Sequence, residues 1–112
     1  MSKFSHLDFE IKYPLITRPT QFFPKEAQVI ITEYNVNGAK AIVGVDLQTE
    51  IRIWTATVNM PECPPNEGCV WIDNNGRNHG LMDELIRLGV IRFNDRFARA
   101  KTGYVFECAL ML

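Results

Sequence analysis

Several features that commonly reveal a protein's class are missing from this 112-residue sequence. Its uninterrupted apolar runs are only a few residues long, far short of the roughly 20 that a membrane-spanning helix needs, so no membrane partner is expected. The first residues contain no apolar segment followed by a cleavage site, so no secretion signal is predicted. The formal net charge is only -1, so no overall field attracts nucleic acid or an anionic membrane. A cytoplasmic protein with local binding surfaces is expected.

Cysteine is scarce, and its spacing is typical of neither a disulfide framework nor a metal site. Cys63, Cys69 and Cys108 form an odd set without a CxxC pair, which favours reduced thiols. Together with His79 they could supply four zinc ligands, but the Cys63–Cys69 spacing on a proline-rich loop lacks the tight ligand pairs of structural zinc sites. Neither a metal nor another cofactor is predicted.

Alternation of apolar and polar residues predicts strands over much of the chain. The clearest case runs from Leu7 to Tyr13, and Pro14 is expected to end it. Pro19 and Pro24 follow closely, so the next segment is predicted to be a loop or a sheet edge. Further strands are predicted over residues 28–34, 39–47, 50–59, 69–72, 90–93 and 103–112, with a hairpin turn at 35–38. The apolar set changes parity within 50–59, which indicates either a strand covered on both faces or a bulge.

Helical spacing of apolar residues is found in one segment, 75–91. The apolar residues there are Leu81, Met82, Leu85, Ile86 and Leu88. Their spacing predicts one short helix over about 78–88. Asn78 is the expected N-cap, and Gly89 is the expected left-handed residue that ends the helix.

These elements predict a single α+β domain over residues 1–112. The expected architecture is a twisted, mostly antiparallel sheet of about five to six strands packed on one short helix. The helix would cover one face of this sheet, so a partner or a second protomer is expected on the other face. The apolar C-terminal residues Leu110, Met111 and Leu112 suggest a strand that docks in the sheet or pairs across a homodimer.

A basic segment follows the predicted helix and is expected to be a loop. Its candidate partner-binding residues are Arg92, Phe93, Arg96, Phe97, Arg99 and Lys101, against a single acidic residue, Asp95. Arginine and aromatic residues dominate the energetics of protein interfaces. The same combination also binds single-stranded nucleic acid, through phosphate contacts and base stacking. A third interpretation is a solvated loop whose phenylalanines are anchored in the core.

Catalysis is a further hypothesis. His79 and Asp83 are four residues apart near the start of the predicted helix, and with Cys69 they are residue types used in nucleophilic catalysis. No nucleophile elbow, glycine-rich phosphate loop or HExxH motif accompanies them. The alternative is that His79 is an ordinary polar residue of the first helical turn and that Asp83 pairs with Arg87 at the surface. Enzymatic activity is therefore not favoured.

Four short motifs follow one another in the C-terminal half of the chain. They are Thr57-Val58-Asn59-Met60-Pro61-Glu62, the helical segment Asn78-x-Gly80-Leu81-Met82-x-Glu84-Leu85-Ile86, Gly89-Val90-Ile91 and Gly103-Tyr104-Val105. In this order they resemble a family of small, functionally uncharacterised proteins found in bacteria, phages and other mobile elements. The resemblance covers residues 53–112 and implies a compact α+β fold and a prokaryotic or mobile-element origin, with no catalytic residues. The basic stretch at 91–101 is longer and more charged than that family's pattern.

Three hypotheses for function follow. The first is a non-enzymatic protein-binding module of bacterial or mobile-element origin that occupies a surface on a host protein, and the resemblance suggests inhibition of a host defence protein. The second is a small nucleic-acid-binding protein that uses the basic residues of the 92–101 loop. The third is a small hydrolase or transferase that uses His79 with Cys69 or Asp83.

Overall fold

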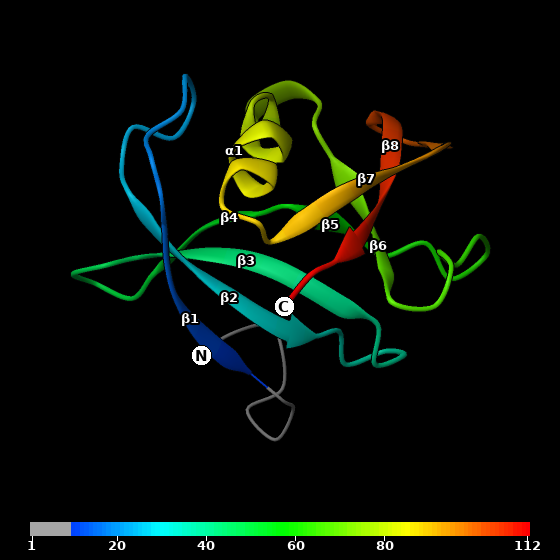
Figure 1. The fold of residues 1–112 in the computed structure, drawn as a ribbon, viewed down its shortest axis with the longest axis horizontal. Helices are drawn as coiled ribbons and strands as arrows, with labels where there is room; N and C mark the ends of the chain where they lie inside the picture. Colours follow the sequence, from blue (N-terminus) through cyan, green and yellow to red (C-terminus); the bar gives the residue numbers. More distant parts are fainter. Residues whose placement is uncertain (1–9) are drawn as a thin grey trace.

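A computed structural model describes residues 10–112 and shows two β-sheets and one short helix (Figure 1). The strands are β1 (Ile11–Thr17), β2 (Ala27–Glu33), β3 (Lys40–Asp46), β4 (Arg52–Thr55), β5 (Thr57–Val58), β6 (Cys69–Asp73), β7 (Ile91–Ala100) and β8 (Gly103–Leu110). A 3-10 turn (Gly76–Asn78) precedes the helix α1 (Leu81–Arg87). The predicted α+β class with antiparallel pairing is therefore confirmed.

The strands form two four-stranded sheets, so the predicted single sheet of five to six strands is wrong. The first sheet has the order β1-β2-β3-β4 and the second has the order β5-β6-β8-β7. All strand pairs in both sheets are antiparallel. In Figure 1 the first sheet crosses the lower part of the molecule, while α1 and the second sheet lie above it.

Ala56 explains why the predicted strand over 50–59 is two strands. The chain leaves the first sheet after Thr55 and enters the second at Thr57. Between them, the Ala56 N–H donates to Ile42 O at 2.9 Å, and the Ala56 carbonyl accepts from the Asp73 N–H at 2.8 Å. One buried residue thus connects the two sheets. The parity change of the apolar residues marks this crossing.

The first strand continues past Pro14, contrary to the prediction that it ends there. β1 reaches Thr17, with an irregular register between Lys12 and Ile16. It lies at the edge of the first sheet, where proline's missing N–H donor is tolerated. The predicted edge position of this segment is therefore confirmed, whereas Leu7 and Phe9 lie outside the described residues.

The helix is shorter than the predicted 78–88, and Asn78 does not cap it. Asn78 ends the 3-10 turn, and its side-chain Nδ2 donates to Thr55 O at 2.9 Å. The side chain of Asn74 takes the capping role, because its Oδ1 accepts from the N–H of Gly80 at 3.0 Å and of Met82 at 3.4 Å. Gly89, at φ 77°, follows the helix in the left-handed conformation as predicted.

The main core lies between the two sheets and the helix. Its buried side chains come from all three layers: Ala27, Val29, Ile31, Ile42, Trp54, Val70, Ile72, Leu81, Leu85, Ile91 and Cys108. Gly44 leaves room for the Trp54 ring, because a Cβ atom on Gly44 would lie 2.3 Å from Trp54 Cε2. On the opposite face of the first sheet, Ile30, Ala41, Val43 and Val45 form a second buried cluster. Within residues 10–112 no helix is long and apolar enough to cross a membrane.

Candidate interaction surface on β7 and β8

The strand predicted over 90–93 continues through the basic segment, so the predicted loop is wrong. β7 is ten residues long and pairs with β8 as far as the turn at Lys101 and Thr102. The register shifts between Phe93 and Arg96, and Asp95 within this bulge has a φ of 58°. The charged residues and the bulge together hide the strand pattern in the sequence. β7 is the last strand of its sheet, so its outer side is a free edge in the described part of the chain.

One side of this hairpin carries aromatic rings, and we call it the aromatic face. It consists of Phe93, Phe97, Arg99, Tyr104 and Phe106. The rings meet edge to face, with centroids 5.8 Å apart for Phe93–Phe106 and 5.4 Å apart for Phe97–Tyr104. The Arg99 guanidinium carbon lies 5.7 Å from the Tyr104 ring centroid. Phe97 is 64% exposed, so the interpretation that both phenylalanines are anchored in the core is wrong.

The opposite side of the hairpin is organised around a buried carboxylate, and we call it the Glu107 face. Glu107 is fully buried and accepts hydrogen bonds from the backbone N–H of Asn66 at 2.9 Å, from the side-chain amides of Asn66 and Asn94, and from Arg96 Nη1 at 2.8 Å. Burial raises the pKa of Glu107, but these donors and the Arg96 charge outweigh it, so the pKa lies below its usual value. Glu107 is therefore ionised at neutral pH and fixes the 61–68 loop against β7 and β8.

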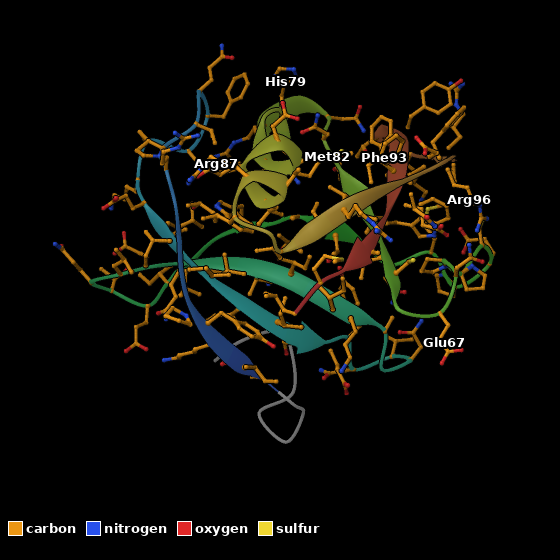
Figure 2. The ribbon with its side chains drawn as sticks, viewed as in Figure 1. Glu67, His79, Met82, Arg87, Phe93 and Arg96 are labelled. Carbon is orange, nitrogen blue, oxygen red and sulfur yellow. The ribbon has the colours of Figure 1, made fainter. Side chains whose placement is uncertain are left out.

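The six predicted binding residues are divided between these two faces. Phe93, Phe97 and Arg99 belong to the aromatic face. Arg92 and Arg96 belong to the Glu107 face, because they pair in register with Ala109 and Glu107. Lys101, the sixth residue, lies in the turn between β7 and β8. Figure 2 shows the division, with Phe93 on the side of β7 that faces α1 and Arg96 toward the 61–68 loop.

Arg96 already has structural partners. Its guanidinium forms an ion pair with Glu107, and its Cζ lies 5.8 Å from the Trp71 ring centroid. The Trp71 indole N–H in turn donates to Cys63 O at 2.7 Å. Arg96 therefore stabilises the sheet as well as bordering the surface. Tyr104 and Phe106 are the residues of the aromatic face that the sequence analysis missed, although their position directly after a short Lys-Thr-Gly turn is typical of a hairpin strand.

The surroundings of Cys69 and Cys108 do not favour a reactive thiolate. Burial is the main reason that the pKa of Cys69 is raised, which leaves less thiolate at neutral pH. Cys108 lies in the main core on the other side of the second sheet, and burial raises its pKa to about 12. Among residues 10–112 no group of three or more His, Cys, Asp or Glu side chains is placed to hold a metal ion.

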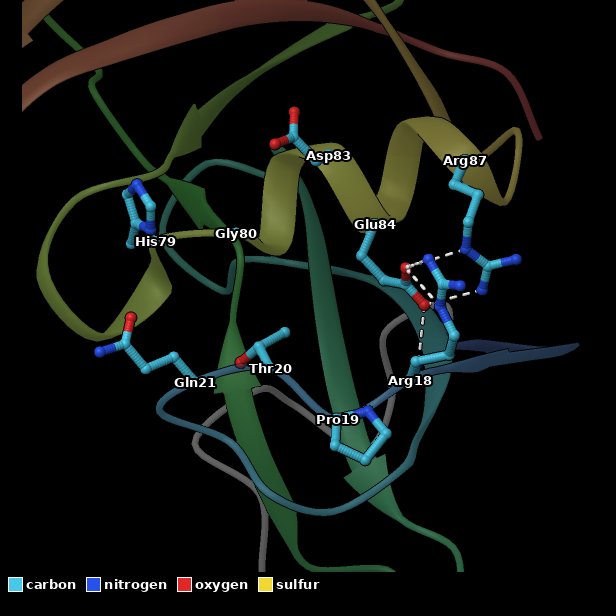
Figure 3. A pocket seen from close by; sticks show the side chains of 9 residues that line it. All are labelled: Arg18, Pro19, Thr20, Gln21, His79, Gly80, Asp83, Glu84 and Arg87. Carbon is cyan, nitrogen blue, oxygen red and sulfur yellow. Dashed lines mark hydrogen bonds and ion pairs between the residues drawn. The ribbon is translucent and has the colours of Figure 1, made fainter.

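His79 lies in a separate surface pocket with a volume of about 480 Å³ (Figure 3). The pocket is lined by Arg18, Pro19, Thr20, Gln21, His79, Gly80, Asp83, Glu84 and Arg87. His79 precedes the helix and is separated from it by Gly80, so the predicted His79–Asp83 pair does not share a helix face. Cys69 is not among the lining residues. The pocket therefore brings His79 together with Asp83 but not with Cys69, and the His79–Asp83 version of the catalytic hypothesis stays a prediction.

The wall of this pocket is fixed by a buried carboxylate with two arginines. Glu84 accepts from the Arg18 backbone N–H at 2.6 Å and from the Arg18 side chain, and Arg87 donates Nε and Nη2 to it at 2.9 and 2.8 Å. Hydrogen bonding from Arg87 is the main cause that lowers the pKa of Glu84 to about 2, with Arg18 contributing and burial opposing. Arg87 thus pairs with Glu84. In the described part of the chain, the expected pair between Asp83 and Arg87 is not formed. The cluster attaches the segment after β1 to α1.

Comparison with protein-family models, with curated proteins and with solved structures finds no match to this chain. The resemblance to the mobile-element family is therefore still a prediction. The function has to be argued from the surface described above.

Proposed function

We propose that this protein is a non-enzymatic protein-binding module that holds its partner at the β7 edge. The observation that carries the proposal is the position of β7 as a ten-residue edge strand between the aromatic face and the Glu107 face. A partner along this edge contacts residues from both faces. A partner on one face alone would miss half of the candidate residues.

The exposed side chains are of the types that dominate protein interfaces. Phe97 and Tyr104 are 64% and 49% exposed, although burial of an aromatic ring is favourable. Arg99 lies over Tyr104 and stiffens this pair. Rigid aromatic anchors beside a cation lose little conformational entropy on binding. If the mobile-element resemblance holds, a host protein is the partner class to test first, and a defence protein would be the specific case.

The test is a pull-down from bacterial lysate with the tagged protein, with and without nuclease. We expect a stoichiometric protein that survives nuclease and is lost with the double variant Phe97→Ala/Arg99→Ala. The matched control is Phe22→Ala/Lys25→Ala, which removes an exposed aromatic residue and a cation from the segment before β2. If the β7 variant retains the partner as well as the control does, the proposal is wrong.

Nucleic-acid binding is the second candidate, because the exposed rings of Phe97 and Tyr104 lie beside Arg99 on one face. Stacked bases would use this face, and phosphates would contact Arg99 and Lys101. Its affinity for a single-stranded oligonucleotide would fall steeply as salt rises, because counterions are released on binding. Loss of the captured material on nuclease treatment would favour this candidate over the first.

A further inference from the structure

We infer that the partner presents an acidic, extended segment that pairs with the free edge of β7 and becomes the fifth strand of the second sheet. This inference rests on the proposed function and specifies how the partner is bound. Backbone hydrogen bonds would hold the segment, as in other cases of strand addition. Its selectivity would come from the charge of β7.

The geometry of β7 places the pairing segment between Arg96 and Ala100. On the N-terminal side, the bulge at Asn94 and Asp95 interrupts the ladder with β8. From Arg96 to Ala100 the pairing with β8 is continuous. In an antiparallel pair, alternate residues direct their N–H and C=O groups away from the existing partner. This regular stretch therefore offers an incoming strand an uninterrupted set of donors and acceptors.

Side chains of an added strand would alternate between the two faces of the hairpin. One set would contact Phe97 and Arg99 on the aromatic face. The other set would lie on the Glu107 face near Arg96. The added strand would therefore meet an apolar and a positively charged surface at the same time.

The positive charge of the β7 edge determines which kind of strand can pair with it. The segment 92–101 has four cations and one acidic residue, and within the described residues no ion pair is found for Arg92, Arg99 or Lys101. Pairing of β7 with a second copy of itself would bring these cations together, and like charges across a strand pair are destabilising. Charges on an edge strand also prevent indiscriminate pairing with neutral strands. An acidic segment is attracted to this edge, whereas a second copy of β7 is repelled by it.

The experiment uses synthetic ten-residue peptides with blocked ends, one alternating Glu and Val and the other alternating Lys and Val. Binding to the full chain is measured by NMR titration, together with amide hydrogen exchange of β7. We expect the Glu-Val peptide to bind at least tenfold more tightly than the Lys-Val peptide, with alternate amides of residues 96–100 slowed in exchange. Equal binding of both peptides, or shifts that map away from β7, would overturn the inference.

Two further measurements separate the possible causes. The variant Arg99→Glu/Lys101→Glu should lose at least tenfold in affinity for the Glu-Val peptide, whereas the control Lys12→Glu/Lys25→Glu, with the same charge change beside the first sheet, should not. Binding without slowed β7 amides would show side-chain attraction only and would refute strand addition. A single-stranded oligonucleotide that displaces the peptide and binds more tightly would also refute it.

Failure here is distinguishable from failure of the proposed function. If the Glu-Val peptide does not bind but the lysate partner is still lost with Phe97→Ala/Arg99→Ala, the module binds its partner without strand addition. If that variant retains its partner, the proposed function itself is wrong, whatever the peptide does.

Discussion

The replacement Glu84→Gln should destabilise the protein at neutral pH and lose its effect in acid. Lowering the pKa of Glu84 from 4.5 to about 2 corresponds to roughly 3 kcal/mol of folding free energy at pH 7, as an upper value. The side chains of Arg18 and Arg87 are 66% and 42% exposed, so solvent screening should reduce the measured loss to about 2 kcal/mol. Glutamine keeps the shape but removes the charge that both arginines contact.

The dependence on pH identifies the cause. A carboxylate with a lowered folded pKa stabilises the protein above its unfolded pKa, and this contribution is lost as pH falls through the folded pKa. The difference in unfolding free energy between the native chain and Glu84→Gln should therefore be full above pH 5. This difference should shrink to about two fifths of its full value by pH 3 and become negligible below pH 2.

Urea unfolding followed by tryptophan fluorescence measures this difference, because Trp54 and Trp71 are both buried. The neighbouring Asp83→Asn is the matched control, since Asp83 is an exposed carboxylate of the same helix and should change stability by less than about 0.5 kcal/mol. A Glu84→Gln effect that stays constant from pH 7 to pH 3 would refute the electrostatic explanation. It would instead indicate altered packing.

The other predictions concern packing, the second buried carboxylate and the thiols. Gly44→Ala should lower the free energy of unfolding by about 1–3 kcal/mol in urea titration, because its Cβ would overlap the Trp54 ring. Glu107→Gln should lower the free energy of unfolding by about 2 kcal/mol at pH 7 and by less in acid, because a buried amide replaces the carboxylate that accepts from Asn66 and Arg96. Cys108 should react with a maleimide only when urea unfolds the chain, and rapid native-state labelling at that residue would contradict its burial.

Local patterns in the sequence predicted the local structure well. The hairpin turn before β3, the strands on either side of it and the left-handed Gly89 follow from turn residues and apolar spacing. The division into two sheets could not be predicted in this way, because it depends on which carbonyl and amide Ala56 meets in the folded chain. The hydrogen bond between Arg18 and Glu84 could not be predicted either, because these residues are 66 positions apart in the sequence.

The candidate surface was predicted by residue type but not by arrangement. The positions of Arg92 and Arg96 differ in parity from those of Phe93 and Phe97, which would have separated the two faces if the segment had been recognised as a strand. The bulge at Asp95 and the many charges favoured a loop instead. The structural role of Arg96 depends on Glu107, which only the register of β8 brings beside it.

Ala56, which links the two sheets, also has a consequence for cooperativity. Ala56 donates to the first sheet and accepts from the second, so neither sheet can open without breaking a buried hydrogen bond of the other. The two sheets should therefore melt as one unit, and the Ala56 amide should exchange with solvent only through global unfolding. A chain cut at this position should yield two fragments that fold only in each other's presence.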